Sequence, residues 1–378
     1  MIYKDFKDLK LSNLGLGTMR LPVIDGKEGQ IDEQAAAKMV ALAMEQGINY
    51  FDTAWMYHEY TSEVVMGKIL KQYPRDSFYL ATKFPGMNPD YRGKPEEIFE
   101  KQLEKCQVEY FDFYLVHNLN EKNLNGYLDD NDPVMPYLLE QKEKGRIRHF
   151  GLSVHGSVET LKAFLDKWGE YMEFCQIQLN YIDWDLQKAC DKVALLNERS
   201  IPIWVMEPLR GGKLATLSEA NTAKLNALRP DEGIPAWGFR YLQSIPGVTM
   251  ILSGMSNEEQ IRDNIRTFAD DRPLNAHEME VIAGIAAEMS GGVPCTACRY
   301  CTTNCPMGLD IPRLLELYNE FIFSDGGFLA PMMVSAMHPD KRPTACLRCR
   351  VCEKMCPQNI KISEVLDDFA EKLAKKAD

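Results

Sequence analysis

Four polar residues in the first third of the chain are of the types that hydride chemistry on a carbonyl requires. Asp52 and Tyr57 stand in the stretch DTAWMY, Lys83 in LATKFPG and His117 in DFYLVHN. Hydride transfer to a carbonyl leaves an alkoxide that must receive a proton, which a tyrosine can supply. Because the ordinary pKa of tyrosine is about 10, a neighbouring cation is needed to ease its ionisation. We expect Lys83 to be that cation, Asp52 to hold it in an ion pair and His117 to hydrogen-bond the substrate oxygen.

A second group of residues is typical of single-electron chemistry. Eight of the eleven cysteines lie in two runs near the end of the chain, and both runs have the spacing Cys-x2-Cys-x2-Cys-x3-Cys-Pro. In proteins with two 4Fe-4S clusters, this spacing places three cysteines on one cluster and the fourth on the other. Structural zinc is the alternative, but zinc sites usually use two separated Cys-x2-Cys pairs. Two 4Fe-4S clusters are therefore predicted. Their expected ligands are Cys295, Cys298, Cys301 and Cys356 for the first, and Cys346, Cys349, Cys352 and Cys305 for the second.

The elements that must position these residues follow a repeating pattern. Short apolar runs rich in β-forming residues alternate with amphipathic helical stretches, such as 32–47, which starts at Asp32 and stops at Gly47. Eight such alternations predict a (β/α)8 barrel, in which catalytic residues sit at the carboxyl ends of the strands. A doubly wound open sheet is the alternative. A short hairpin at the start of LKLSNLGLG is expected to close the barrel bottom. The predicted strands are 13–19, 48–54, 78–84, 111–117, 149–155, 174–180, 202–208 and 248–254.

The pattern changes near residue 285. We therefore predict a barrel domain over 1–285 and a small, mainly α-helical domain that carries the clusters over 286–378. The stretch IPRLLELYNEFIF between the two cysteine runs reads as a helix and favours an α-helical ferredoxin type. A domain of this size usually needs a metal group to be stable.

Composition narrows the class of protein. The chain has 378 residues, of which 45% are hydrophobic and 26% charged, as in ordinary globular proteins. A net charge of −12 argues against nucleic acid or an anionic membrane surface as a partner, because both attract basic patches. No run approaches the roughly 20 apolar residues of a membrane span, and the first residues do not resemble a signal peptide. We expect a cytoplasmic protein.

Residues 13–270 resemble the aldo-keto reductases. DTAWMY matches the family's Asp-Thr-Ala-x-x-Tyr stretch, and Lys83 and His117 match the two other members of its catalytic tetrad. The resemblance implies a (β/α)8 barrel and a nicotinamide cofactor bound without a Rossmann fold. With the cysteine runs included, the chain resembles the branch of that family with a C-terminal iron–sulfur domain.

The resemblance also implies a set of cofactor contacts, with departures. Met206 stands where an aromatic residue often stacks on the nicotinamide, and Val154 stands where the family often has asparagine. Gly254 and Gln260 occupy the positions at which many members hold the 2′-phosphate of NADP with a lysine and an arginine, so this loop supports no NADP preference and NAD(H) or NADP(H) both stay open. The expected contacts are Ser153, Gln176, Met206, Pro208, Leu209, Gly211, Ser253, Gly254, Ser256, Gln260 and Asn264.

Three functions fit these patterns. The favoured one is a nicotinamide-dependent oxidoreductase that reduces a small carbonyl compound or oxidises an alcohol, with Tyr57 as general acid and base and with structural or regulatory clusters. The alternative is an electron-transfer oxidoreductase that couples a flavin or redox substrate in the barrel to a ferredoxin or another electron-transfer protein through the clusters. The third is a cofactor-binding sensor with little turnover.

Overall fold

The computed structural model describes residues 1–295, 298–299, 301–356 and 358–377. Pro357, which ends the second cysteine run, lies outside the described residues. The chain divides into two compact units, and the division falls within helix α13. The first unit comprises Met1–Tyr181 and Ala189–Ile282, and the second comprises Ile182–Lys188 and Ala283–Asp378.

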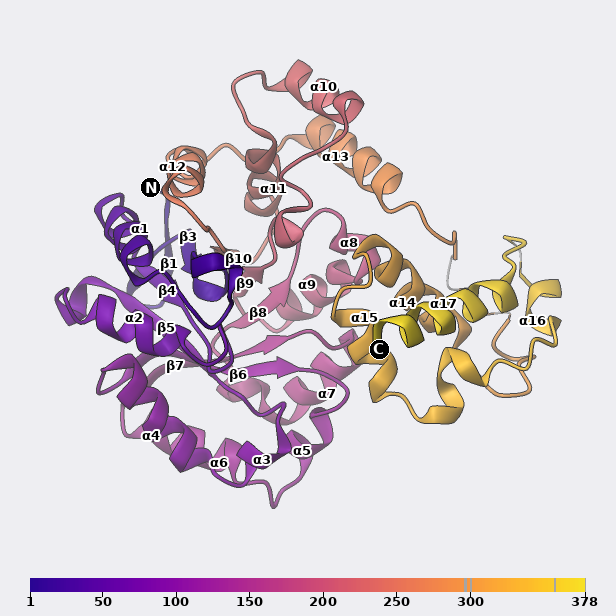
Figure 1. Ribbon diagram of the computed structural model, residues 1–378, viewed down its shortest axis with the longest axis horizontal. Helices are drawn as coiled ribbons and strands as arrows, with labels where there is room; N and C mark the ends of the chain where they lie inside the picture. Colours follow the sequence, from indigo (N-terminus) through magenta and orange to yellow (C-terminus); the bar gives the residue numbers. More distant parts are fainter. Residues whose placement is uncertain (296–297, 300, 357, 378) are drawn as a thin grey trace. The chain divides into compact units, whose positions relative to one another are not determined.

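The first unit is a closed barrel of eight parallel strands, in the order β10-β3-β4-β5-β6-β7-β8-β9 (Figure 1). The predicted barrel is therefore confirmed, and the open sheet is not formed. Most strand residues are buried, because helices cover the outer face and side chains fill the interior. The strands are β3 (Leu14–Gly17), β4 (Tyr50–Asp52), β5 (Tyr79–Phe84), β6 (Phe111–Leu119), β7 (Ile147–Val154), β8 (Cys175–Gln178), β9 (Ile203–Met206) and β10 (Val248–Ser253).

Helices connect and surround the strands. The first of them, α1 (Glu33–Glu45), begins where the sequence predicts, because Asp32 Oδ1 accepts hydrogen bonds from the backbone N–H groups of Gln34 and Ala35. Gly47 follows the helix with a φ of 92°, a conformation that favours glycine. The other helices of this unit are α2 (Ser62–Leu70), α3 (Pro89–Arg92), α4 (Pro95–Cys106), α5 (Leu124–Leu128), α6 (Val134–Glu143), α7 (Val158–Trp168), α9 (Ala189–Glu198), α10 (Glu219–Leu228), α11 (Ile234–Gln243), α12 (Glu258–Thr267) and the first part of α13 (Ala276–Met289).

A hairpin of β1 (Tyr3–Phe6) and β2 (Leu9–Ser12) closes the barrel at the end where the strands begin. Phe6 is buried in the barrel interior, with its ring centroid 5.0 Å from that of Trp204 and edge-on to it. The hairpin starts at Tyr3, six residues before the stretch in which the sequence places it, and only its second strand falls in that stretch. The closed bottom leaves the opposite end as the mouth at which polar residues gather.

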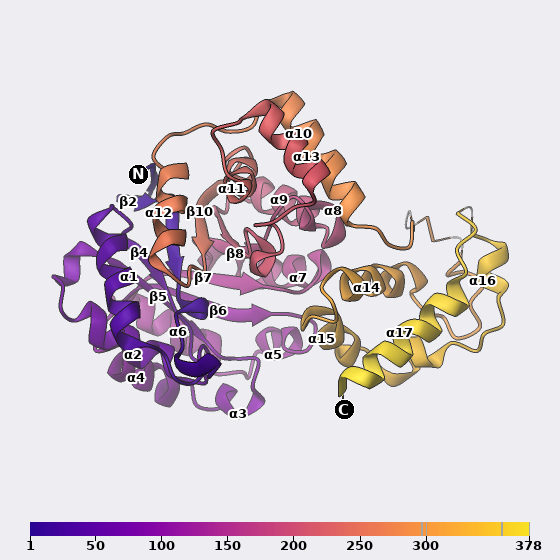
Figure 2. The same cartoon turned by 45° about the horizontal axis from the view of Figure 1, so that its top comes forward.

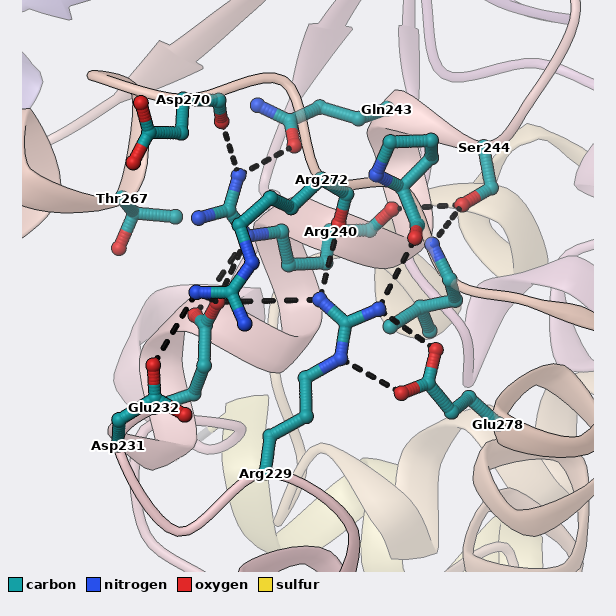
Figure 3. Close-up of polar contacts among 12 residues, drawn as sticks. Arg229, Asp231, Glu232, Arg240, Gln243, Ser244, Thr267, Asp270, Arg272 and Glu278 are labelled. Carbon is teal, nitrogen blue, oxygen red and sulfur yellow. Dashed lines mark hydrogen bonds and ion pairs between the residues drawn. The ribbon is translucent and has the colours of Figure 1, made fainter.

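A network of arginines and carboxylates fastens the last elements of the barrel (Figure 3). Arg229, just after α10, donates two hydrogen bonds of 2.6 Å to the two carboxylate oxygens of Glu278 on α13. Arg240 on α11 pairs with Glu232, and both side chains are buried. Arg272 adds ion pairs to Asp231 and Glu232. The bidentate pair ties α13 to the segment that leads into α11.

The second unit is mainly helical, as the sequence predicts. Helices α14 and α17 lie side by side (Figure 2), joined by a hydrogen bond of 2.7 Å from Tyr318 to Asp368 and by an edge-on contact of Phe321 with Phe369. Helix α8, which follows β8 in the chain, also belongs here, and its neighbour Gln187 donates a hydrogen bond to Glu320. Among the described residues, none of the helices is both long and apolar enough to cross a membrane. The helices are α8 (Asp183–Leu186), α14 (Ile311–Phe323), α15 (Leu329–Ala336), α16 (Val351–Lys354) and α17 (Ile362–Ala377).

Candidate active site

The four residues singled out for hydride chemistry meet at the mouth of the barrel. Asp52 is the last residue of β4, Lys83 lies one residue before the end of β5, and His117 lies in the last third of β6. Tyr57 follows in the turn after β4. Because β4, β5 and β6 are parallel neighbours, their carboxyl ends bring these side chains to one place.

Lys83 is the centre of the group. Its side chain is fully buried, and its ammonium donates to Asp52 Oδ1 at 2.6 Å, to the backbone oxygen of Thr53 at 2.7 Å and to Tyr57 Oη at 3.3 Å. An ammonium has three N–H donors, so these three acceptors satisfy it completely. The lysine therefore holds the phenol oxygen and the carboxylate in a fixed relation.

Burial sets the protonation states of these groups. It raises the pKa of the Tyr57 phenol, with Lys83 acting in the opposite direction, so Tyr57 carries its proton at neutral pH. Burial alone would lower the pKa of Lys83, but the negative charge of Asp52 and the hydrogen bonds to Asp52 and Tyr57 outweigh it and raise that pKa. Lys83 is thus a cation next to a protonated phenol, which is the arrangement that an acid of the tyrosine type requires.

His117, on β6, lies beside Tyr57. The two ring centroids are 6.0 Å apart and the rings meet edge-on. Burial, followed by the positive charge of Lys83, lowers the pKa of His117 well below its usual value, so its imidazole is neutral. Its Nδ1 atom is buried and has no partner among the described residues. A neutral imidazole keeps one N–H, which can donate to a substrate oxygen.

Three of the predicted cofactor contacts lie on neighbouring strands. Ser153 on β7 and Gln176 on β8 are paired in the sheet, and both are buried. Ser153 Oγ accepts a hydrogen bond of 3.0 Å from the backbone of Asn118, whereas Gln176 Oε1 is buried without a partner among the described residues. Met206 ends β9 and is half-buried. The unpaired amide oxygen of Gln176 fits a ligand with an N–H donor, as the carboxamide of nicotinamide has.

The remaining predicted contacts follow β9 and β10. Pro208, Leu209 and Gly211 lie in the loop after β9, and Gly211 has a φ of 65°. Helix α12 begins after β10 with Asn257 as its cap, whose side chain accepts from the backbone N–H of Gln260 at 2.9 Å. The backbone N–H groups around such a helix start suit a phosphate.

Side-chain contacts order the second of these loops. Gln260 Oε1 accepts a hydrogen bond of 2.7 Å from the backbone of Ser256, and Asn264 Nδ2 donates to Ser253 Oγ at 3.1 Å. Gly254 lies exposed between them. The side chain of Gln260 is therefore turned back onto its own loop.

The sequence reasoning missed two charged residues at this mouth. Arg20, in the loop after β3, runs past Gly254 and reaches Gly211, and Glu207 directly follows β9. The positions of both after a barrel strand were a signal that could have found them, since every such loop faces the mouth. Their types alone did not distinguish them from ordinary surface charges.

The cysteine runs line two cavities in the second unit. One cavity has Cys305, Cys346, Cys349 and Cys352 in its wall, and the other has the remaining four, Cys295, Cys298, Cys301 and Cys356. Each cavity thus takes three cysteines from one run and the fourth from the other. In the part of the chain that the structure describes, no three His, Cys, Asp or Glu side chains are arranged to hold a single metal ion. Four thiols around one cavity suit a multi-iron group.

Comparisons with known proteins agree with this geometry. The model of the aldo/keto reductase family matches residues 13–287, and the model of the 4Fe-4S dicluster domain matches residues 294–361. The NADH-specific methylglyoxal reductase of Escherichia coli is 25% identical over 327 residues, which cover 75% of this chain and 96% of that protein. The L-galactose dehydrogenase of Arabidopsis thaliana is 29% identical over 299 residues, which cover 74% and 91%.

Solved structures show the same barrel. An aldo-keto reductase from Bacillus halodurans in its holo form superposes with a TM-score of 0.61 at 24% identity, covering 75% of this chain and 96% of that one. An aldo-keto reductase from Klebsiella pneumoniae in complex with NADPH gives a TM-score of 0.58 at 21% identity, covering 76% and 96%. At these identities the likeness concerns the fold.

Proposed function

Because the chain belongs to the aldo/keto reductase family, we propose that it catalyses the nicotinamide-dependent reduction of a small carbonyl compound, or the reverse oxidation of an alcohol, with Tyr57 as general acid and base. The observation that carries this proposal is the set of contacts around one buried ammonium, in which Lys83 Nζ lies 2.6 Å from Asp52 Oδ1 and 3.3 Å from Tyr57 Oη. Residues 1–285 form the reductase domain, and 286–378 form the cluster domain.

The residues at the mouth fit a nicotinamide dinucleotide. The unpaired buried oxygen of Gln176 would accept from the carboxamide, and the loops after β9 and β10 would hold the phosphates. The similar protein from Escherichia coli is described as NADH-specific and acts on methylglyoxal, which supports NAD(H) and a small carbonyl substrate here. The proposed contacts are Ser153, Gln176, Met206, Pro208, Leu209, Gly211, Ser253, Gly254, Ser256, Gln260 and Asn264.

In the reduction, the side chains of the barrel handle the proton. A bound nicotinamide would supply the hydride for the carbonyl carbon, and Tyr57 would give its proton to the substrate oxygen. The phenolate that remains is stabilised by the Lys83 ammonium, which Asp52 keeps in place. Neutral His117 donates a hydrogen bond to the substrate oxygen and so orients the carbonyl. Oxidation of the alcohol runs through the same groups in reverse.

Tyr57→Phe tests the acid. Loss of the phenol proton should lower kcat by roughly 10²–10⁴-fold, the usual contribution of a general acid, while nicotinamide affinity changes little. The assay follows nicotinamide oxidation with a panel of small aldehydes and ketones. Tyr60→Phe is the matched control, because Tyr60 lies three residues further on and is 49% exposed. Equal carbonyl reduction by Tyr57→Phe and wild type would contradict the role of Tyr57.

The cluster domain holds two 4Fe-4S clusters in this proposal, with ligands crossing between the runs. The composition of the two cavity walls supports this arrangement, since Cys305 faces the cysteines of the second run and Cys356 those of the first. Cys298→Ser should damage the first cluster, and Cys305→Ser should damage the second although Cys305 belongs to the first run. Iron content and electron paramagnetic resonance of the reduced protein measure this. If both variants lost the same signal, each run would hold its own cluster.

The second candidate function is electron transfer between a flavin or redox substrate in the barrel and a ferredoxin-type partner. The two four-cysteine cavities favour it, because clusters move electrons singly and a hydride moves two. The absorption spectrum of the protein as isolated separates flavin from cluster. Turnover only with a one-electron acceptor would favour this candidate, and oxidation of the nicotinamide by a carbonyl without any acceptor would exclude it.

A further inference from the structure

Arg20 is held firmly at the mouth of the barrel by its neighbours. It ends a short 3-10 helix, η1 (Thr18–Arg20), directly after β3. The hydroxyl of buried Thr18 donates to the backbone oxygen of Asp52 at 2.9 Å, and the backbone oxygen of Thr18 is 3.1 Å from His58 Nε2. Leu21, on the other side, is buried. The backbone of Arg20 is therefore tied to the strand end that carries Asp52.

The side chain of Arg20 crosses from one cofactor loop to the other. A Cβ atom on Gly254 would lie 3.1 Å from Cδ and 3.2 Å from Cγ of Arg20, and one on Gly211 would lie 3.0 Å from Nη2. The chain of carbons thus lies against the loop after β10, and the guanidinium reaches the loop after β9. The missing side chain at Gly254 leaves the space that Arg20 occupies.

The guanidinium of Arg20 has no hydrogen bond or ion pair with any residue that the structure describes. The carboxylate of Glu207 also approaches Gly211, with its Oε2 atom 3.8 Å from the Cβ position of that glycine, yet Glu207 and Arg20 form no ion pair. A guanidinium has a planar set of N–H donors that matches phosphate oxygens. This cation is open to a ligand between the two loops that the proposed function assigns to the dinucleotide.

We propose that Arg20 binds a phosphate group of the nicotinamide dinucleotide and replaces the cation that is absent at position 254. The proposal rests on the proposed function, because it assigns a further residue to the same cofactor site. Either the pyrophosphate or the ribose 2′-phosphate offers the required chemistry, and the two differ in whether NADH also depends on Arg20. In this role Arg20 acts on cofactor affinity.

Arg20→Met is the direct test, with titrations of NADH, NADPH and adenosine 2′,5′-bisphosphate into the full-length protein. A hydrogen bond to a charged group contributes enough that its loss should weaken binding roughly 10- to 100-fold, and the ratio should shrink at high salt. Equal losses for NADH and NADPH would assign Arg20 to the pyrophosphate. Losses confined to NADPH and the bisphosphate would assign it to the 2′-phosphate. Binding of all three within about twofold of wild type would overturn the proposal.

Two further variants provide a matched control and a rescue of binding. Arg266→Met is the matched control, because Arg266 is 76% exposed on α12 and pairs with Asp263. Arg20→Ala combined with Gly254→Lys should recover part of the lost affinity, since it returns a cation to position 254 after the obstructing side chain is gone. Failure of this rescue, with unfolding midpoints like that of wild type, would count against a shared phosphate site.

The outcomes also separate this proposal from the proposed function. Wild type that binds neither NADH nor NADPH would refute both. Wild type that binds and turns over a nicotinamide while Arg20→Met matches it in KM for that nucleotide would refute the role of Arg20 alone. A raised KM for the nucleotide with kcat little changed is the expected result.

Discussion

Replacement of Lys83 by methionine should destabilise the barrel because it leaves a charge buried without its partner. Lys83 is 0% and Asp52 2% exposed, and Asp52 Oδ2 already has no partner among the described residues. Removal of one member of a buried ion pair typically costs about 3–5 kcal/mol of the free energy of unfolding. Methionine keeps nearly the length of lysine, so the loss reports mainly on the stranded carboxylate and on the lost hydrogen bonds.

The loss should depend on pH in a defined direction. Burial already raises the pKa of Asp52, and Lys83 opposes that shift. Without Lys83 the pKa of the folded Asp52 rises further above its ordinary value of about 3.9, so the folded variant binds a proton that the unfolded chain has released. Stability from a raised pKa is lost as pH rises, so Lys83→Met should be less destabilised near pH 5 than near pH 8.

The double variant Asp52→Asn with Lys83→Met separates stability from catalysis. It removes both charges, so it should regain much of the free energy of unfolding, whereas turnover should stay as low as in Lys83→Met. Urea unfolding followed by tryptophan fluorescence measures the first quantity, and carbonyl reduction measures the second. Lys101→Met is the control, because Lys101 pairs with Glu104 on the exposed face of α4. Equal losses near pH 5 and pH 8, or a double variant no more stable than the single one, would refute the reasoning.

Two further predictions concern the barrel. Burial, followed by the charge of Lys192, lowers the pKa of His155 to about 4. Between about pH 6.5 and pH 4, His155 is therefore protonated in the unfolded chain but neutral in the folded chain, so the folded state loses stability as pH falls. In His155→Gln the free energy of unfolding should therefore fall by roughly 3 kcal/mol less than in wild type between pH 6.5 and pH 4. An unchanged pH profile of urea unfolding would contradict this. Glu278→Gln breaks the bidentate pair with Arg229 and should lower the free energy of unfolding by about 1–3 kcal/mol with turnover unchanged, whereas Glu280→Gln, 82% exposed in its side chain, should do neither.

The barrel could be predicted from the sequence because its elements carry local signals. The run from Phe111 to Val116 is buried on both faces and is apolar except at Asp112, and Asp32 supplies the side chain that caps α1. The meeting of Asp52, Lys83 and His117 at the mouth could be predicted for the same reason, since a residue near the end of a strand has its position fixed once the strand is known. The hairpin was predicted too late in the sequence because its first strand, YKDF, buries only Phe6 fully and so shows no clear apolar face.

The parts that the sequence did not predict depend on the paths of side chains across loops. Nothing in the order of residues shows that Arg20 lies along Gly254, or that Gln260 turns back to the backbone of Ser256. The grouping of residues 182–188 with the second unit is likewise set by packing, since helix α8 is only four residues long. Contacts between segments far apart in sequence decide these features, and a single sequence does not contain them explicitly.

The structure gives Gly254 and Gln260, in the loop after β10, roles that the sequence does not show. From the sequence, both residues count as lost cations, and the loop supports no NADP preference. In the structure, Gln260 orders the loop by accepting from Ser256, and Gly254 makes room for Arg20. A cation delivered from the loop after β3 can serve the same phosphate as one delivered from position 254, because a binding site is defined by where a charged group lies and not by which segment carries it. Cofactor preference in this chain therefore has to be judged from Arg20 together with residues 253–264, and a comparison restricted to the loop after β10 would leave Arg20 out.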